Sequence, residues 1–325
     1  MKMFAYAKSW DRVADRAMAI APDLVPVLIH VDGSLTCGGE SVAHEDVEFD
    51  AAWASSDLFL TGPAGVAFKL FRNNHAMKWF QSGAAGFDHP VFSEIASNGT
   101  LMTRSDAQGI AIAEFIFARV FELLQPVMER RQAQENKEWY RPGFSDMWGK
   151  TWMIIGMGAI GNETAIRAKA FGCRVIGVRR NPTGDEAADE MIQPAEVTDR
   201  LPEADIVVLT TPLNEETHHM VNADFLKAMK LKSILVNVGR GGLVNEQDLF
   251  HGLFEGRPGN AILDVFNEEP LPDDSPLWHH KNVLMTAHCA AFSPLTQQRG
   301  DALFVENLRR YVAGEPLKLV VEGLA

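Results

Sequence analysis

The chain has 325 residues, more than one hydrophobic core usually organises, so its length predicts two domains. Hydrophobic residues make up 46% of it and charged residues 22%, which is typical of a folded globular protein and excludes a disordered one. The formal net charge of −13 argues against nucleic acids and anionic membranes as partners, because both are polyanions. A small anionic substrate stays compatible, since local charge decides its binding.

The cysteine and histidine spacings predict neither disulfides nor a metal site. The chain has three cysteines without pairing or metal-ligand spacing, which is typical of a reducing compartment. Two adjacent histidine pairs lack a third ligand at metal spacing. The longest apolar stretch, residues 109–124, contains Glu114 and Arg119 and is too short and too charged to span a bilayer. We therefore expect a cytoplasmic protein with no metal and no membrane contact.

In the first hundred residues, short apolar runs alternate with helical stretches, which predicts a parallel sheet covered by helices. Strands are expected at about 2–7, 25–31, 57–61 and 77–81. The next element is a helix from Gln108 to about Glu135, because its apolar residues recur at core-facing spacing. Pro126 should kink or interrupt this helix.

From Thr151 the alternation restarts with six apolar runs: WMIIGMG, CRVIGVR, DIVVLTTP, SILVNVGR, AILDVF and NVLMTAH. Helical segments lie between most of them, which predicts a complete doubly wound domain. A last helix over 293–311 should return the chain to the first domain. The expected fold class is therefore α/β, with two Rossmann-like doubly wound parallel-sheet domains separated by a cleft. Their expected bounds are 1–103 plus 293–325 for one domain and 104–292 for the other.

A glycine motif follows the first of these six runs. Gly156-Met157-Gly158-Ala159-Ile160-Gly161 is G-x-G-x-x-G, with a strand before it and a helix over 162–171 after it. The first glycine permits the tight turn, the second lets backbone approach a pyrophosphate, and the third lets helix and strand pack closely. In this setting the motif predicts dinucleotide binding. The alternative is a glycine turn that only packs.

The end of the second strand bears on which dinucleotide is bound. An NAD site usually has an Asp or Glu here for the ribose 2′-hydroxyl. In this chain the strand ends in Arg179-Arg180-Asn181, with no carboxylate in reach. Two guanidiniums suit a 2′-phosphate, which favours NADP over NAD. The alternative is a solvated arginine pair on a loop.

Three later strands end in groups that carry chemistry. Arg240 lies among glycines after one apolar run, Asp264-Val265-Phe266-Asn267-Glu268-Glu269 follows another, and His288 ends the last. Carboxyl-end loops of open α/β sheets meet at the ligand crevice, so these groups should converge. Each alone would more often be structural. Together, on a dinucleotide domain, they indicate a hydride-transfer site.

At these residues the sequence resembles the D-isomer-specific 2-hydroxyacid dehydrogenases, over essentially the whole chain. The motifs that carry the resemblance are QSGAAGFD (81–88), GMGAIG (156–161), TTPLNEETHHM (210–220), NVGRGGLVNEQDL (237–249), DVFNEEPLP (264–272) and TAHCAAF (286–292). The resemblance implies hydride transfer between NAD(P)H and a small 2-keto acid, giving a D-2-hydroxy acid. Glyoxylate and hydroxypyruvate are the candidate substrates, and NADP(H) is the expected cofactor, with NAD as the alternative.

The resemblance also implies roles for individual residues. Arg240 would bind and orient the substrate through its carboxylate and carbonyl oxygen, and the backbone of Ala85 and Gly86 would hold the carboxylate. His288 would be the general acid that protonates the carbonyl oxygen, and the base in reverse. Glu269, next to a proline as in the family, would bond to His288 and fix its tautomer.

The cofactor site expected from the glycine motif, the arginines and the resemblance is a larger set, in which Asp264 is similar to the family residue near the nicotinamide carboxamide. Its members are Gly156, Gly158, Ala159, Ile160, Gly161, Arg179, Arg180, Thr211, Pro212, Val238 and Asp264. Two positions depart from the family. Ala287 replaces the usual proline before the catalytic histidine, and Arg179 replaces the ribose-binding acid.

A rival interpretation is a non-catalytic dinucleotide sensor, like the family's corepressor branch. Such a protein can keep the arginine, glutamate and histidine, so these residues do not discriminate. The absence of a disordered interaction tail favours the enzyme. Aromatic residues Trp139, Tyr140 and Trp148 lie where the family forms a dimer, so the chain is expected to be a homodimer.

Overall fold

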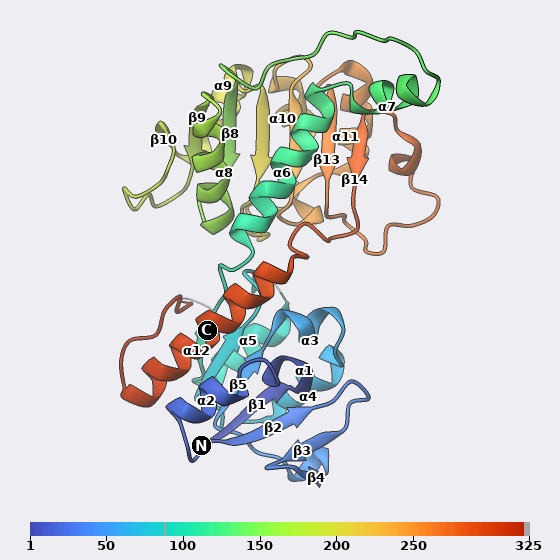
Figure 1. Cartoon of the computed structure of the whole chain (residues 1–325). Coiled ribbons are helices and arrows are strands. Elements are labelled where there is room, and N and C mark those ends of the chain that lie inside the picture. The colour runs from blue at the N-terminus through green and yellow to red at the C-terminus, as the bar shows by residue number, and fades with distance from the viewer. Residues whose placement is uncertain (88, 322–325) are drawn as a thin grey trace. The chain divides into compact units, whose positions relative to one another are not determined.

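A computed structural model describes residues 1–87 and 89–321 of the chain (Figure 1). The chain divides into two compact units. Unit 1 comprises Met1–Gln108 and Ser293–Ala325, and unit 2 comprises Gly109–Phe292. Within the described residues, no helix is long and apolar enough to cross a membrane.

Unit 1 is built on a seven-stranded sheet of order β4-β3-β2-β1-β5-β6-β7. Its strands are β1 (Lys2–Tyr6), β2 (Val25–Ile29), β3 (Leu35–Cys37), β4 (Glu40–Val42), β5 (Ala51–Ala54), β6 (Trp79–Ser82) and β7 (Leu101–Thr103). Strands β2, β1, β5, β6 and β7 pair in parallel, whereas β3 and β4 add an antiparallel hairpin at one edge. The helices are α1 (Ala7–Trp10), α2 (Ala14–Ile20), η1 (His44–Asp46), α3 (Ser56–Leu60), α4 (Ala64–Asn73), α5 (Pro90–Ser97) and α12 (Pro294–Ala313).

One expected strand of unit 1 is wrong. Residues 57–61 lie in and just after helix α3, and the strand is the alanine-rich β5 just before it. Ser55 causes the switch, because its side chain accepts a hydrogen bond from the N–H of Leu58 and caps the helix. Alanine has low β propensity, so β5 owes its state to burial on both faces of the sheet.

Helix α12 belongs to unit 1 although it follows unit 2 in the chain. The Arg12 guanidinium donates to Asp301 on α12 and to Asp57 on α3, with Nε–Oδ2 and Nη2–Oδ2 distances of 2.7 and 2.6 Å. These bonds, that to Asp301 above all, raise the pKa of Arg12 further above its usual value. Phe304 of the same helix stacks on Trp53 with ring centroids 4.1 Å apart.

Unit 2 contains a seven-stranded parallel sheet of order β10-β9-β8-β11-β12-β13-β14. Its strands are β8 (Thr151–Ile155), β9 (Arg174–Val178), β10 (Glu190–Ile192), β11 (Ile206–Leu209), β12 (Ile234–Asn237), β13 (Asn260–Leu263) and β14 (Val283–Met285). All six expected runs form strands, and β10 is additional. The helices are α6 (Gly109–Leu124), α7 (Val127–Glu135), α8 (Ala159–Ala170), η2 (Pro194–Glu196), α9 (Val197–Arg200), η3 (Leu201–Glu203), α10 (Ala223–Ala228), η4 (Gly241–Leu243), α11 (Glu246–Glu255) and η5 (Pro276–His279).

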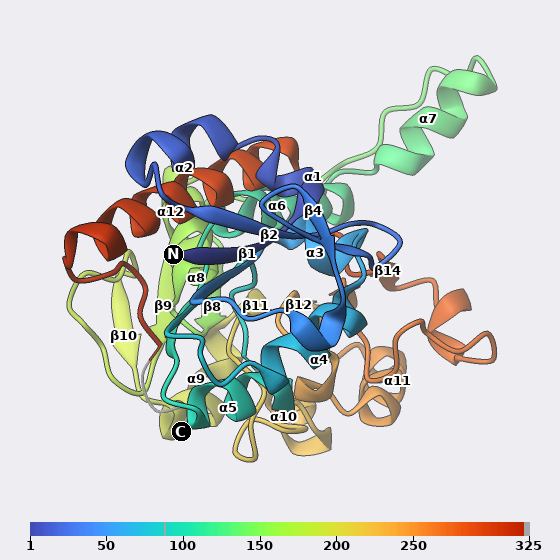
Figure 2. The same cartoon turned by 90° about the horizontal axis from the view of Figure 1, so that it is seen from below.

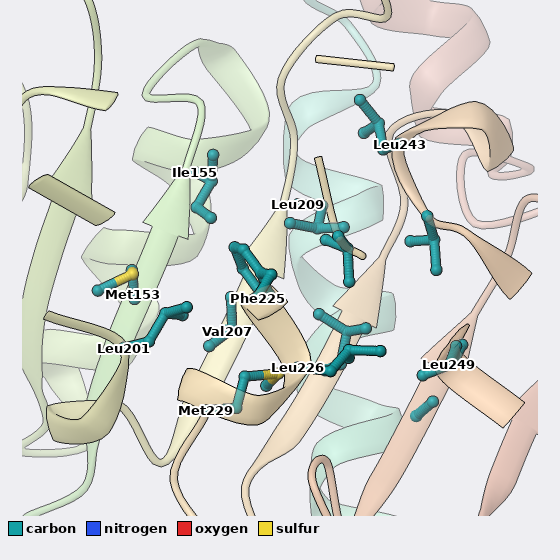
Figure 3. Close-up of a cluster of buried hydrophobic side chains, with 14 of the residues drawn as sticks. Met153, Ile155, Leu201, Val207, Leu209, Phe225, Leu226, Met229, Leu243 and Leu249 are labelled. Carbon is teal, nitrogen blue, oxygen red and sulfur yellow. The ribbon is translucent and has the colours of Figure 1, made fainter. Parts of the chain in front are cut away.

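The sheet of unit 2 is buried on both faces because its strands are apolar at successive positions. On β8, Met153 and Ile155 join one buried cluster with α9, α10 and α11, which Figure 3 shows in close-up. Trp152 and Ile154 point to the opposite face and join a second cluster with α6 and α8. The two clusters confirm the expected doubly wound arrangement of this sheet.

Pro126 interrupts the long helix after unit 1, as expected. Helix α6 ends at Leu124 and α7 begins at Val127. Figure 2 shows α7 and the chain after it extending away from the rest of unit 2. On this extension Trp139 and Tyr140 are 87% and 52% exposed, and Trp148 beyond it is 78% exposed.

Candidate functional site

The residues predicted on unit 2 follow the carboxyl ends of neighbouring strands. Because β9, β8, β11, β12, β13 and β14 are adjacent and parallel, their carboxyl ends share one edge of the sheet. The groups that follow these strands along that edge are Arg179, the glycine loop from Gly156, Thr211, Arg240, Asp264 and His288. The structure therefore brings the predicted groups of unit 2 to one edge.

The glycine loop packs as the G-x-G-x-x-G motif predicts. A Cβ on Gly156 would lie 2.6 Å from the nitrogen of Thr211, and one on Gly161 would lie 2.2 Å from the carbonyl oxygen of Gly156. Gly158 is exposed, with no described atom within 4 Å of the position a Cβ would take. Gly158 and Ala159 are exposed at the start of helix α8, and no described side chain caps its first N–H groups.

The end of β9 itself carries no carboxylate, but the loop after it folds one back against Arg179. Glu186, seven residues later in the loop after β9, lies with Oε1 3.0 Å from Arg179 Nη1. The Glu186 side chain is only 1% exposed, and it also accepts bonds from Thr183 and from the N–H of Gly184. The N–H of Thr183 contributes most to lowering the pKa of Glu186 to about 2, so this carboxylate stays charged.

Arg179 also joins the loop after β9 to the glycine loop. Its Nη1 donates to the carbonyl oxygen of Met157 at 3.2 Å, and the Oδ1 of Asn162 accepts from the N–H of Ala187 at 2.9 Å. Both predicted arginines carry a glutamate partner, because exposed Arg180 pairs with exposed Glu216 in the loop after β11. Because each arginine has a glutamate partner, this part of the site carries less net positive charge than the two arginines alone would give it.

The loop after β11 meets the glycine loop through Thr210, whose hydroxyl donates to the carbonyl oxygen of Gly156 at 2.6 Å. Of the two predicted residues that follow, Thr211 is half-buried and Pro212 is exposed. Val238, after β12, is 6% exposed and packs in the cluster that α6 and α8 cover. Its side chain is thus part of the core, which leaves its backbone as the part that can face a ligand.

Asp264 holds the loop that carries His288. The Asp264 residue is 2% exposed. Its carboxylate accepts hydrogen bonds from the Thr286 hydroxyl at 2.6 Å and from the N–H groups of Cys289 and Ala290 at 2.9 and 3.0 Å. The N–H of His288 donates to the Asp264 carbonyl oxygen at 2.7 Å. The Asp264 carboxylate therefore serves to hydrogen-bond other residues of the protein.

His288 and Glu269 form a directed pair. Nδ1 of His288 lies 2.8 Å from Oε2 of Glu269, and Oε1 of Glu269 accepts from the N–H of Phe266 at 3.0 Å. The His288 side chain is 52% exposed, and its φ of 49° lies in the left-handed region that costs energy for a residue other than glycine. The bonds that this loop donates to Asp264 hold His288 in the strained conformation. The imidazole thus presents Nε2 to solvent.

Arg240 follows β12 with extended backbone at φ −143° and ψ 146°. The Asn237 side chain donates to its carbonyl oxygen at 2.9 Å, and Nη1 of Arg240 donates to the carbonyl oxygen of Gly239 at 2.8 Å. Gly241, next in the chain, packs so tightly that a Cβ would lie 1.9 Å from the carbonyl carbon of Phe266. The segment from Asn237 is thus fixed on the segment that carries Glu269.

Ala85 and Gly86 lie in unit 1, on the loop after β6. Ala85 is exposed and Gly86 is half-buried. Asp88, the last residue of the expected motif 81–88, lies outside the described residues. The other predicted site residues, Arg240, Glu269 and His288 included, lie in unit 2.

Two features of the site were missed from the sequence. Glu186 lies beyond the usual ribose-binding position, and its only signal is the turn sequence Asn181-Pro182-Thr183-Gly184 that folds it back. The anchoring role of Asp264 was also missed, since four partners spread over 286–290 leave no local pattern.

Comparison with known proteins identifies the family. Residues 117–290 match the family model of the D-isomer specific 2-hydroxyacid dehydrogenase NAD binding domain. A glyoxylate reductase of Korarchaeum cryptofilum is 36% identical over 245 residues, which are 71% of this chain and 72% of that protein.

Solved structures agree with this match over the whole fold. A D-isomer specific 2-hydroxyacid dehydrogenase family protein of Aeromonas salmonicida is 27% identical with a TM-score of 0.81, covering 99% of this chain and 98% of that one. A family member from Xanthobacter autotrophicus, solved with NADPH and MES, is 26% identical with a TM-score of 0.76, covering 99% and 97%. The chain belongs to the D-isomer-specific 2-hydroxyacid dehydrogenases, a family of NAD(P)-dependent oxidoreductases that act on small 2-hydroxy and 2-keto acids.

Proposed function

We propose that this chain reduces a small 2-keto acid, glyoxylate or hydroxypyruvate, to the D-2-hydroxy acid with NADPH. The observation that carries the proposal is the His288–Glu269 pair, 2.8 Å between Nδ1 and Oε2, at the sheet edge that also carries the glycine loop. A histidine oriented by a carboxylate and exposed at Nε2 is suited to exchange a proton with a substrate oxygen. The similar glyoxylate reductase supports the substrate class.

The cofactor residues fit a dinucleotide. Gly158 leaves open space at the start of α8, and the helix N-terminus supplies N–H donors and positive potential for a pyrophosphate. We propose that Arg179 and Arg180 hold the 2′-phosphate of NADP, with Thr211, Pro212 and the backbone of Val238 along the same edge. Reduced nicotinamide supplies the hydride when it is bound. Glu186 pairs with Arg179 and Glu216 pairs with Arg180, so the two glutamates weaken the preference for NADP but do not abolish it.

The remaining roles concern the substrate. Arg240 would bind the carboxylate and the carbonyl oxygen, because a guanidinium fork matches such oxygens bidentately. The N–H groups of Ala85 and Gly86 would hold the carboxylate, and His288 would donate its Nε2 proton to the carbonyl oxygen as charge develops there. Glu269 would keep Nδ1 protonated and so fix the tautomer. Asp264 would act by holding the His288 loop and not by its own chemistry.

These roles assign a task to each unit. We propose that unit 1 is the substrate-binding domain and unit 2 the dinucleotide-binding domain, with α12 the element that completes the first. The exposed Trp139, Tyr140 and Trp148 support a homodimer, since solvent-exposed aromatic side chains are enriched in interfaces. Sedimentation velocity tests the dimer: a single monomeric species at micromolar concentration would contradict it.

The function is tested by a panel of 2-keto acids with NADPH and, separately, NADH. We expect NADPH oxidation with glyoxylate or hydroxypyruvate and slower oxidation with NADH. Tight cofactor binding without turnover of any keto acid would instead favour the non-catalytic sensor.

A further inference from the structure

The loop that follows β6 (residues 83–87, the substrate loop) is fixed at its start by close backbone packing. The N–H of Gly83 donates to the carbonyl oxygen of Ala54 at 2.6 Å. A Cβ at position 83 would lie 2.4 Å from the nitrogen of Ser56. Only glycine therefore fits between β6 and the first turn of α3. This packing fixes the N–H group and the Cα of Gly83 and leaves its carbonyl group to be held by another residue.

Gln108 holds that carbonyl group. Its Nε2 donates a hydrogen bond to the carbonyl oxygen of Gly83, twenty-five residues earlier in the chain. The N–H of Ser105 donates to the next carbonyl oxygen, that of Ala84, at 3.1 Å. The segment just before α6 therefore forms hydrogen bonds with two successive residues of the substrate loop. Gln108 supplies the only side chain among these contacts.

The far end of the loop is held differently, and two N–H groups between the ends stay available. Phe87 packs on Phe92 of α5 with ring centroids 4.7 Å apart. Within residues 1–87 and 89–321, the N–H groups of Ala85 and Gly86 have no hydrogen-bond acceptor. Two successive N–H groups left open between two anchors form a suitable binding site for an anion.

The other end of the Gln108 amide is not used for stability. Its Oε1 is buried and has no hydrogen-bond partner in the described part of the chain. Burying an unpaired polar atom costs at least as much free energy as a single amide hydrogen bond to Gly83 contributes. An apolar side chain of the same length would therefore serve stability about equally well. We therefore attribute the presence of an amide at position 108 to the hydrogen bond that it makes with the substrate loop.

We propose that Gln108 is a positioning residue for the keto-acid substrate. Its amide fixes the Gly83 carbonyl group and thereby sets the direction of the N–H groups of Ala85 and Gly86 two and three residues later. This inference rests on the proposed function of the loop as the carboxylate binder. It adds to that function a specific side chain outside the loop that determines substrate affinity.

The test is Gln108→Met, which keeps the length of the side chain and removes both polar atoms. We expect the KM for glyoxylate to rise about tenfold while kcat changes by less than about twofold, as for an interaction made equally in the ground and transition states. The Kd for NADPH, measured by fluorescence, should be unchanged because the proposed cofactor residues lie in unit 2. The Tm should stay within about 3 °C of the wild type, since the lost bond and the removed unpaired atom offset one another.

Gln297→Met is the matched control. Gln297 lines the same small hollow as Gln108 but donates to Asp57 Oδ1 at 2.7 Å instead of to the loop. Its KM for glyoxylate should equal that of the wild type, whatever its Tm.

An unchanged KM in Gln108→Met, or an equal rise in both variants, would overturn the positioning role. Failure of Gln108→Met to fold would also overturn it, since it would show that the amide serves stability. If the wild type reduces no 2-keto acid at all, the proposed function fails first, and the positioning role falls with it.

Discussion

Nδ1 of His288 lies 2.8 Å from Oε2 of Glu269, and the other oxygen of the same carboxylate accepts the N–H of Phe266. Both carboxylate oxygens are therefore engaged, which fixes the direction of the carboxylate and, through it, the imidazole. Nε2 is left to exchange a proton with a substrate.

This pair should behave as one unit in kinetics. His288→Ala should lower kcat by about 10²–10⁴, the usual contribution of a general acid. Glu269→Gln should lower kcat less, because it loses orientation but keeps the imidazole. The double variant should be no slower than His288→Ala, since Glu269 acts only through the histidine. Steady-state rates of the four proteins give the answer, and additive losses would show that the two residues act independently.

The arginine after β9 should determine the response to the 2′-phosphate. Arg179→Gln should raise the KM for NADPH by roughly 10- to 100-fold, as expected for loss of a charged hydrogen bond, and leave the KM for NADH nearly unchanged. Arg174→Gln is the matched control, because Arg174 begins the same strand and pairs with Glu190 and Glu203. Equal effects on NADPH and NADH would argue against a 2′-phosphate site.

Glu186 should make stability depend on pH. Its pKa falls from the usual 4.5 to about 2 in the folded protein, chiefly because of the Thr183 N–H. A lowered pKa stabilises the fold above the unfolded value, and this contribution is lost as pH falls through the folded value. The free energy of unfolding of the wild type should exceed that of Glu186→Gln at pH 7, and the difference should shrink between about pH 5 and pH 2. Urea titrations at several pH values measure it; a difference independent of pH would contradict the assignment.

Gly83 should tolerate no side chain. Gly83→Ala should destabilise unit 1 by about 1–3 kcal/mol, because the new Cβ would overlap the backbone of Ser56. Gly65 provides the control, since it is exposed on α4 with no described atom near its Cβ position. Gly65→Ala should stabilise by about 0.5 kcal/mol through helix propensity. Thermal melts of both variants test the pair, and equal shifts would be inconsistent with this packing.

Much of the fold could be predicted because strands of unit 2 are continuous apolar runs bounded by glycine and polar residues. The break at Pro126 and the glycine turn were equally local signals. The error at residues 57–61 had a physical cause: a short apolar run fits a strand or a helix, and the Ser55 cap decides in favour of the helix. The three-residue strands β3, β4, β7 and β10 were missed because so short a segment gives no periodicity.

The site residues were predictable where each follows a strand, since parallel strands bring such positions to one edge. Hydrogen-bond partners that are brought together by the folding of loops could not be predicted. Glu186 returns to Arg179 through a turn, and the Gln108 amide reaches Gly83 across twenty-five residues. Neither contact has a periodic or local signature, so both required the folded chain.

The most direct test is NADPH oxidation by the wild type and by His288→Ala, with glyoxylate and hydroxypyruvate, beside NADPH binding measured on both proteins. We expect turnover of at least one keto acid by the wild type, a loss of about 100-fold or more in His288→Ala, and equal NADPH affinity of the two proteins. Absence of turnover by the wild type, or undiminished turnover by His288→Ala, would refute the role of His288 as the general acid of a keto-acid reductase.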